Sequence, residues 1–143
     1  MSKKNYDNLM ELLGDTEYRR IEVKGYMRLA VEWISDDLIS LAHYGELNND
    51  PMRDPEIVFR VSRTVIGNDS SSRTVCEAKP VYFRNDYVPI EHATVPGVFG
   101  DVPVKPGLQR DLDSFSAMWF RNLREQRFFE RAKEHDCDHE IER

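Results

Sequence analysis

Short runs of strand-favouring residues, separated by turn residues, dominate the middle of this chain. Between Tyr18 and Phe83, stretches rich in Val, Ile, Tyr and Phe alternate with clusters of Gly, Asn, Asp, Ser and Pro. Runs of this kind are typical of antiparallel strands that follow one another along the chain. The sequence therefore predicts an antiparallel β-sheet of about four or five strands.

Two of these runs differ in how clearly they indicate a strand. In residues 56–61, Ile57, Phe59 and Val61 alternate with other side chains, which predicts a strand with one buried face. Residues 26–34 are ambiguous, because their apolar side chains also fit one face of a helix. We favour a strand there and leave the helix open.

Two amphipathic helices are expected to flank the strands. The first runs from Ser2 to Leu13, with apolar residues at three-and-four spacing and Gly14 as its stop. The second is long and runs from about Asp111 to Lys133. Its main apolar side chains share one narrow sector: Leu112, Phe115, Trp119 and Leu123. The predicted fold class is therefore α+β, with the sheet packed by an N-terminal and a long C-terminal helix.

The length of the chain and its lack of repeats or linkers indicate one domain. A chain of 143 residues has the size of a single folded unit, and it shows no internal repeat and no linker. We assign residues 1–134 to one α+β domain and residues 135–143 to a charged, frayed tail. Residues 88–109 contain four Pro and three Gly, which predicts an ordered surface loop.

Charge and motifs narrow the classes of function. The 26 acidic and 20 basic side chains give a net charge of −6, which disfavours nucleic acid as a partner. There is neither an apolar run of membrane-spanning length nor a hydrophobic signal core, so we expect a cytoplasmic protein without a membrane partner. The sequence has no phosphate-binding glycine loop, nucleophile elbow or zinc-protease motif, and we expect no cofactor.

The last predicted helix carries arginines on the side opposite its apolar sector. Together with two interleaved phenylalanines they form a predicted partner surface: Phe120, Arg121, Arg124, Arg127, Phe128 and Arg131. Arg and aromatic side chains are enriched where proteins bind one another, which favours a protein partner or a second copy of the chain. The same residue types also suit stacking on bases and binding of phosphates. A solvated helix face paired with nearby acids is the third interpretation.

Residues 43–56 are expected to form an acidic loop between two strands. Ca²⁺ and Mg²⁺ prefer clustered oxygen ligands, so Glu46, Asp50 and Asp54 are candidate ligands for a metal-assisted hydrolase. The spacing does not match an EF-hand, and a hairpin loop held by Asx turns is the alternative. We interpret His43 as a packed, hydrogen-bonded histidine rather than a catalyst. Residues 135–139 offer a further set for zinc or nickel, with adventitious binding as the alternative.

Three blocks of the sequence resemble one family. The run ISLAHYGELNNDPMRDPEIVF resembles a signature of the form HY-x-E-x-N-G-D-x-M-x-DPE, with Asn49 at the glycine position. PVYFRNDY and FSAMWFRNLREQRF are similar to two further blocks, in the same order. The signature is that of a family of bacterial and phage proteins described only as a domain of unknown function. The matching positions include nine that are called the signature residues below: His43, Tyr44, Glu46, Asp50, Asp54, Glu56, Arg84, Asn85 and Asp86. The others are Met52, Pro55, Tyr82, Trp119, Arg121 and Asn122.

The resemblance implies a small cytoplasmic protein of a bacterial host, often carried by phages, plasmids or conjugative elements, and it implies no known activity. Combined with the arginine-rich helix, it leads us to expect a non-enzymatic protein-interaction protein, accessory to a phage or mobile element. Counter-defence, the inhibition of a bacterial immune system, is one such role. The alternatives are the metal-assisted hydrolase and a nucleic-acid-binding protein that uses the arginines.

Overall fold

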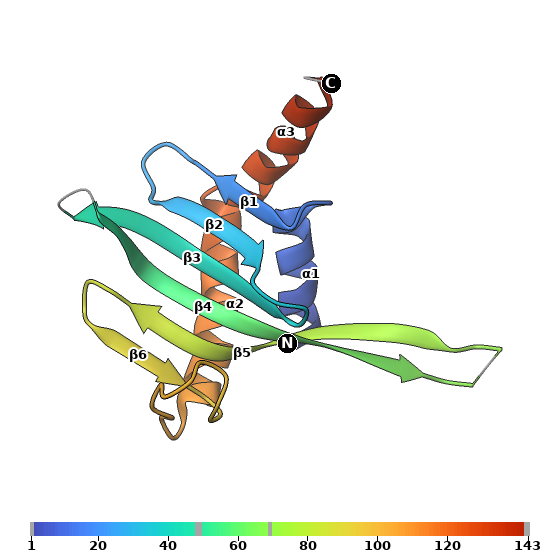
Figure 1. Cartoon of the computed structure of the whole chain (residues 1–143). Helices are drawn as coiled ribbons and strands as arrows, with labels where there is room; N and C mark the ends of the chain where they lie inside the picture. The colour runs from blue at the N-terminus through green and yellow to red at the C-terminus, as the bar shows by residue number, and fades with distance from the viewer. Residues whose placement is uncertain (1, 48–49, 69, 142–143) are drawn as a thin grey trace.

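Six strands form one antiparallel sheet, in which each strand pairs with the next along the chain (Figure 1). The computed structural model describes residues 2–47, 50–68 and 70–141, and the side chains only as far as residue 134. The strands are β1 (Tyr18–Ile21), β2 (Arg28–Trp33), β3 (Leu38–Leu47), β4 (Asp50–Ile66), β5 (Arg73–Asn85) and β6 (Ile90–Ala93). The predicted meander is confirmed, with six strands rather than four or five. The ambiguous residues 26–34 contain the strand β2.

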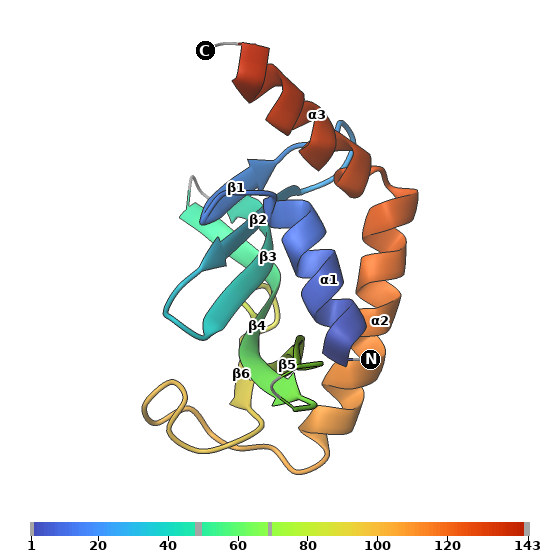
Figure 2. The same ribbon diagram turned by 90° about the vertical axis from the view of Figure 1, so that its right-hand side faces the viewer.

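Three helices accompany the sheet: two cover one of its sides, and the last extends beyond the β1 edge (Figure 2). They are α1 (Ser2–Leu13), α2 (Leu108–Glu125) and α3 (Phe128–Ile141). The α+β class and the N-terminal helix are therefore as predicted. None of the helices, over the ranges given, is long and apolar enough to cross a membrane.

The single C-terminal helix predicted over residues 111–133 is wrong, because the chain turns between α2 and α3. Arg127 has a positive φ of 74°, a conformation that ends a helix. A continuous helix would place Phe128 on the arginine side, whereas the turn buries both Phe128 and Phe129, at 0% and 2% exposure. Burial of these two rings accounts for the break. The backbone of α3 continues to Ile141, where a frayed tail was predicted from residue 135.

The acidic segment is also more regular than predicted. Most of residues 43–56 belong to β3 and β4, whose pairing extends to Leu47 and Asp50 at the end of the hairpin. A shift in register between Ala42 and Tyr44 marks a bulge in this ladder. The predicted acidic loop is therefore wrong for the described residues, because backbone pairing continues almost to the hairpin end.

The alternation predicted for residues 56–61 divides the core between the two faces of the sheet. Ile57, Phe59 and Val61 pack beneath the helices in the main hydrophobic cluster. Val58 points the other way and packs in a smaller cluster with Val81 and Tyr82. This open face is covered in part by the proline-rich loop. Its Phe99 ring lies 4.3 Å from the Tyr82 ring, centroid to centroid.

The far halves of β4 and β5 leave the body as a two-stranded arm (Figure 1). Its register runs from the pair Val61 and Ala78 to the pair Ile66 and Arg73. β3 pairs with β4 only as far as Arg60, and β6 pairs with β5 only from Tyr82 onward. We call residues 61–66 and 73–78 the β4–β5 arm. No third strand flanks it among the described residues.

Candidate functional site

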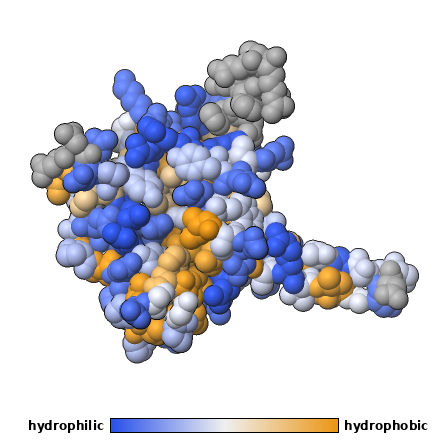
Figure 3. Space-filling model, in the orientation of Figure 1, coloured by the Kyte–Doolittle hydropathy of each residue, from blue (hydrophilic) through white to orange (hydrophobic). Residues whose placement is uncertain are grey.

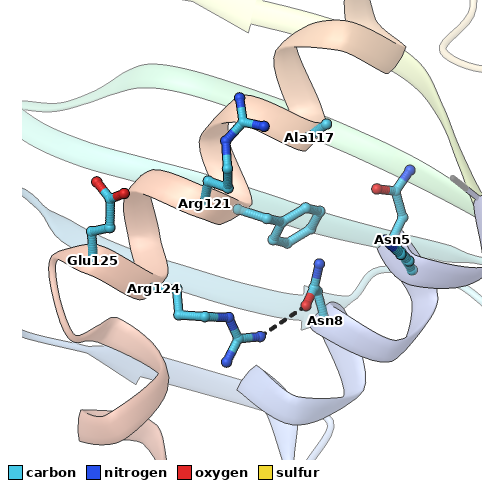
Figure 4. A pocket seen from close by; sticks show the side chains of 8 residues that line it. Asn5, Asn8, Ala117, Arg121, Arg124 and Glu125 are labelled. Carbon is cyan, nitrogen blue, oxygen red and sulfur yellow. Dashed lines mark hydrogen bonds between the residues drawn. The ribbon is translucent and has the colours of Figure 1, made fainter.

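A groove of about 510 Å³ lies between α1 and α2 (Figure 4). Ala117 and Phe120 of α2 form its apolar floor, and Phe120 is only 4% exposed. Polar side chains line the remaining wall: Lys4, Asn5, Asn8, Arg121, Arg124 and Glu125. The groove therefore combines an apolar base with a rim on which basic side chains outnumber acidic ones.

The two helices that make the groove are held by contacts with the sheet. Asn5 is buried, and its side-chain nitrogen donates a hydrogen bond to the carbonyl oxygen of Ala78 in β5, at 3.1 Å. The Phe120 ring packs against Phe59 of β4, with the centroids 5.9 Å apart. Since each helix is anchored separately to the same sheet, the width of the groove is fixed by the fold.

Arg124 of α2 lies in the wall of the groove and links α2 to α1 through hydrogen bonds. Its guanidinium donates to both carboxylate oxygens of Glu11, at 3.1 and 3.2 Å. It also donates to the side-chain oxygen of Asn8, at 3.0 Å (Figure 4). The guanidinium carbon also lies 3.9 Å from the centroid of the Phe129 ring. The hydrogen bonds from Arg124 lower the pKa of the Glu11 carboxyl against the opposing effect of burial. Arg124 is thus chiefly a structural link between helices.

Two other cations at the groove remain available to a ligand. Lys4 and Arg121 are exposed, and neither makes an ion pair with any of the side chains that the structure describes. Arg121 is the member of the predicted partner surface that is best placed to contact another molecule.

The rest of that predicted surface is divided or buried. Arg127 and Arg131 line a separate hollow of about 340 Å³ beside the turn between β1 and β2, and Arg131 pairs with Glu134 at 2.9 Å. Phe120 and Phe128 are 4% and 0% exposed, so their predicted place on an exposed surface is wrong. Both rings serve the core: Phe120 packs against Phe59 from within α2, and the break after α2 turns Phe128 inward.

Several signature residues from distant parts of the chain meet on the open face of the sheet. The Asp86 carboxylate accepts hydrogen bonds from the Arg53 backbone, at 2.9 Å, and from the Arg84 side chain, at 2.7 Å. Arg53 also forms an ion pair with Glu56, with 3.0 Å between Nε and Oε1. Burial raises the pKa of Asp86, but these hydrogen bonds outweigh it, and the net pKa is lowered.

The neighbours of this network are also joined to it. Asn85 donates a hydrogen bond to the Asp54 carboxylate at 2.8 Å, and Ser40 donates one to Glu56 at 2.5 Å. Tyr44 lies beneath Arg28, with 5.6 Å between the guanidinium carbon and the ring centroid. Because the carboxylates of Asp54, Glu56 and Asp86 already have partners, the network's clearest role is to lock β3, β4 and the end of β5 together.

His43 lies on the helix side of the sheet, apart from this network. Its ring packs 5.6 Å from Trp119 and 5.4 Å from Phe128, and its Nδ1 lies 3.1 Å from the Met27 carbonyl oxygen. Burial lowers the pKa of His43, although its backbone hydrogen bonds oppose the effect. The interpretation of His43 as a packed, hydrogen-bonded histidine is confirmed.

The predicted metal ligands do not come together. Glu46 and Asp50 are exposed near the end of the β3–β4 hairpin, while the Asp54 carboxylate accepts a hydrogen bond from Asn85. Among the residues described, no three His, Cys, Asp or Glu side chains are grouped to hold a metal ion. The proposed site at Glu46, Asp50 and Asp54 is therefore wrong, because extended strands separate its members. The candidate set at residues 135–139 falls outside the described side chains.

Comparison with known families gives a match over most of the chain. A family model described as "Domain of unknown function (DUF6908)" matches residues 4–129. The chain belongs to this family. The DUF6908 match includes the groove, the open-face network and the β4–β5 arm. No curated protein and no solved structure shows significant similarity to the chain.

The burial of two polar residues of the DUF6908 fold, Asn5 and Arg19, was not predicted, although the sequence contains signals for it. Asn5 precedes Leu9 by four residues and therefore lies on the apolar face of α1, where a polar side chain needs a partner. Arg19 and Ile21 alternate in β1, so Arg19 shares the buried face, and it is only 2% exposed. A polar residue at an apolar position of a periodic pattern was the signal in both cases.

Proposed function

We propose that this protein is a non-enzymatic interaction protein that binds an acidic segment of a partner protein in the groove between α1 and α2. The supporting observation is that Lys4 and Arg121, which form no ion pair with the described side chains, lie beside the apolar floor formed by Phe120 and Ala117. Side chains of an extended or helical segment would contact the floor, and its carboxylates would meet the two cations.

The size and charge of the groove suit this role. A volume of about 510 Å³ is in the range of sites that hold small ligands or a few side chains of a peptide. Basic groups on an otherwise acidic protein would also orient an incoming acidic partner, because complementary charge steers association and disfavours wrong partners. The lack of a preassembled metal cluster among the described side chains removes the observation that favoured a hydrolase.

The setting we propose is a bacterial cell that carries a phage or mobile element. The resemblance of the signature blocks to bacterial and phage proteins supports this setting. An accessory role fits a groove in which basic side chains surround an apolar floor. Inhibition of a host defence protein is the form of that role we favour.

A charge-reversal experiment tests the groove. Tagged wild-type protein and the variants Lys4→Glu and Arg121→Glu would be used to recover partners from host lysate, and the affinity of each purified partner would then be measured. Arg110→Glu is the matched control, because Arg110 is an exposed arginine of α2 outside the groove. We expect at least a tenfold loss of affinity for the groove variants, about 1.4 kcal/mol, and no loss for the control. Equal binding by all four proteins would exclude the groove.

A further inference from the structure

Two asparagines of α1 present polar groups to the groove between α1 and α2. Asn5 and Asn8 are three residues apart in α1, so they lie on the same side of the helix, with Cβ atoms ~5–6 Å apart. Both line the groove, and Figure 4 shows both side chains on the side of α1 that faces α2. The groove thus carries two neutral amides in addition to its cations and its apolar floor.

The Asn5 amide is held in one orientation with its oxygen open to the groove. Its nitrogen donates to the Ala78 carbonyl oxygen at 3.1 Å, and the residue is only 4% exposed. Within the described part of the chain, the Asn5 oxygen accepts no hydrogen bond, yet it is not among the fully buried polar atoms that lack a partner. This oxygen is therefore an oriented acceptor that a ligand in the groove can reach.

Asn8 supplies the opposite kind of group. Its oxygen accepts a hydrogen bond from Arg124 at 3.0 Å, and Arg124 is itself held by Glu11, so the Asn8 amide is also oriented. The Asn8 nitrogen points away from Arg124 (Figure 4), and it donates to none of the residues that the structure describes. An oriented acceptor and an oriented donor therefore stand side by side on one wall of the groove.

We infer that the groove binds its partner segment in an extended conformation, with the main chain of the segment hydrogen-bonded to Asn5 and Asn8. This inference rests on the function proposed above, and it adds the conformation of the segment and the groups that recognise it. The occupant is a strand-like stretch of a partner protein that carries Asp or Glu side chains for Lys4 and Arg121.

An extended chain matches this pair of amide groups. The N–H and C=O of one residue in a strand point to the same side, as they do where antiparallel strands exchange both hydrogen bonds. The N–H of such a residue would donate to the Asn5 oxygen, and its C=O would accept from the Asn8 nitrogen. In a helix these main-chain groups are already bonded within the helix. A helical segment would cover the Asn5 oxygen without offering it a donor, which is destabilising.

The length of the groove sets the size of the segment. From Ala117 to Glu125, the wall formed by α2 is ~12 Å long, at ~1.5 Å per residue. Extended residues add ~3.3 Å each, so about three or four of them fit. Side chains alternate along a strand. An apolar side chain on Phe120 would therefore be flanked by two side chains at the opening, where their carboxylates meet Lys4 and Arg121.

A capped pentapeptide of alternating valine and glutamate, with valine at both ends and at the centre, tests the inference. It would be titrated into the isotope-labelled full-length protein and followed by NMR, and we expect the side-chain amide signals of Asn5 and Asn8 to shift. N-methylation of the central valine, whose N–H faces α1, should weaken binding about fivefold or more. N-methylation of the next glutamate, whose N–H points away from α1, should leave affinity within about twofold of the parent peptide. The protein is unchanged in this comparison, so its folding does not affect the result.

A variant of the protein gives a second measurement. Asn8→Met removes the donor, while Glu11 still holds Arg124, and it should bind the parent pentapeptide about fivefold more weakly than wild type. Asn122→Met is the matched control, because Asn122 is an exposed asparagine of α2 outside the groove, and it should bind as wild type does. An alanine-rich helical peptide of about 16 residues with the same two glutamates should bind more weakly than the pentapeptide.

Exposed apolar side chains elsewhere are the competing place for a peptide rich in valine. Figure 3 shows an apolar patch around β6 and the proline-rich loop, where Val88 and Ile90 are 58% and 38% exposed. Shifts at Ile90 in place of those at Asn5 and Asn8 would assign the binding to apolar adhesion and overturn the inference.

Three further outcomes would also overturn it. The first is no shift of the two asparagine signals at millimolar pentapeptide. The second is an equal loss of affinity for the two N-methylated peptides, which would exclude main-chain recognition by α1. The third is tighter binding of the helical peptide, which would place a helix in the groove. Loss of partner binding on charge reversal at Lys4 or Arg121 would stand under all of these outcomes, so the two proposals fail separately.

Discussion

Arg19 of β1 donates a hydrogen bond from Nη1 to the carbonyl oxygen of Ala132 in α3, at 3.1 Å. The same nitrogen donates to the Leu12 carbonyl oxygen near the end of α1, at 3.3 Å. The Leu12 carbonyl lies in the last turn of α1, which needs outside donors and favours a nearby cation, whereas the Ala132 carbonyl lies within α3. One buried side chain thus ties the first strand to both the first and the last helix.

Replacement of Arg19 by Met should reduce the free energy of unfolding by about 2–3 kcal/mol. Two buried carbonyl groups lose a charged donor, and the loss of hydrogen bonds to charged groups is costly. Urea denaturation followed by circular dichroism would measure the change. Arg20→Met is the matched control, because Arg20 is exposed and pairs with Glu22 in the same segment, and it should stay within about 0.5 kcal/mol of wild type. Similar losses in both variants would refute the special role of Arg19.

Replacement of Asp86 by Ala should loosen the open-face network. The change removes the partner of Arg84 and one partner of Arg53, and because the site is partly exposed we expect a cost of about 1–2 kcal/mol. Hydrogen exchange should become faster at the Arg53 amide, which donates to Asp86. Asp101→Ala, at an exposed loop position, is the control and should change neither property. Unchanged exchange at Arg53 in the Asp86 variant would count against the network.

Replacement of Arg127 by Gly should stabilise the protein by about 0.5–1 kcal/mol. The positive φ of 74° is unfavourable for a residue with a Cβ atom and is readily adopted by Gly. Arg127→Val should have the opposite effect, because a β-branched residue tolerates this conformation poorly. Thermal unfolding of the two variants measures the difference. If Val were tolerated as well as Gly, the turn between α2 and α3 would not have the conformation described.

Stability should fall as the pH decreases through the ordinary pKa of histidine. Burial lowers the pKa of His43 in the folded protein, so the unfolded chain binds this proton more readily. The contribution is therefore present above the unfolded pKa of ~6.5 and is lost as the pH falls toward the folded pKa. Urea midpoints at pH 7.5, 6.5 and 5.5 should show a smaller dependence for His43→Gln than for wild type. His92→Gln, in β6, controls for the loss of a histidine at a different place in the fold.

The elements formed by local patterns could be predicted well, and those set by distant contacts could not. α1 follows from its spacing and its glycine stop, and β4 follows from the alternation of Ile57, Phe59 and Val61. The break before Phe128 was missed because it depends on which rings the sheet can bury, which a helical wheel does not show. The length of the hairpin to Leu47 was missed because strand pairing overrode the turn preference of Asn, Asp and Pro.

The candidate site was only partly visible in the sequence for the same reason. Arg121 was identified, since it stands on the polar side of a clear amphipathic pattern. Lys4 and Asn8 lie over a hundred residues away from Arg121, and only the docking of α1 beside α2 brings them to the same groove. The signature blocks indicated a shared feature, but the pairing of Asp86 with Arg53 and Arg84 required the register of β4 and β5.

The position of α1 has a consequence for synthesis on the ribosome. The helix emerges before the sheet, yet its Asn5 bonds to Ala78, 73 residues later, and its end is tied through Arg19 to α3. At ~5–20 residues per second, about 4 to 15 s separate the appearance of Asn5 from that of Ala78. During this interval the apolar side chains of Leu9, Leu12 and Leu13 lack their native cover, so the nascent chain presents them to chaperones until the sheet is complete.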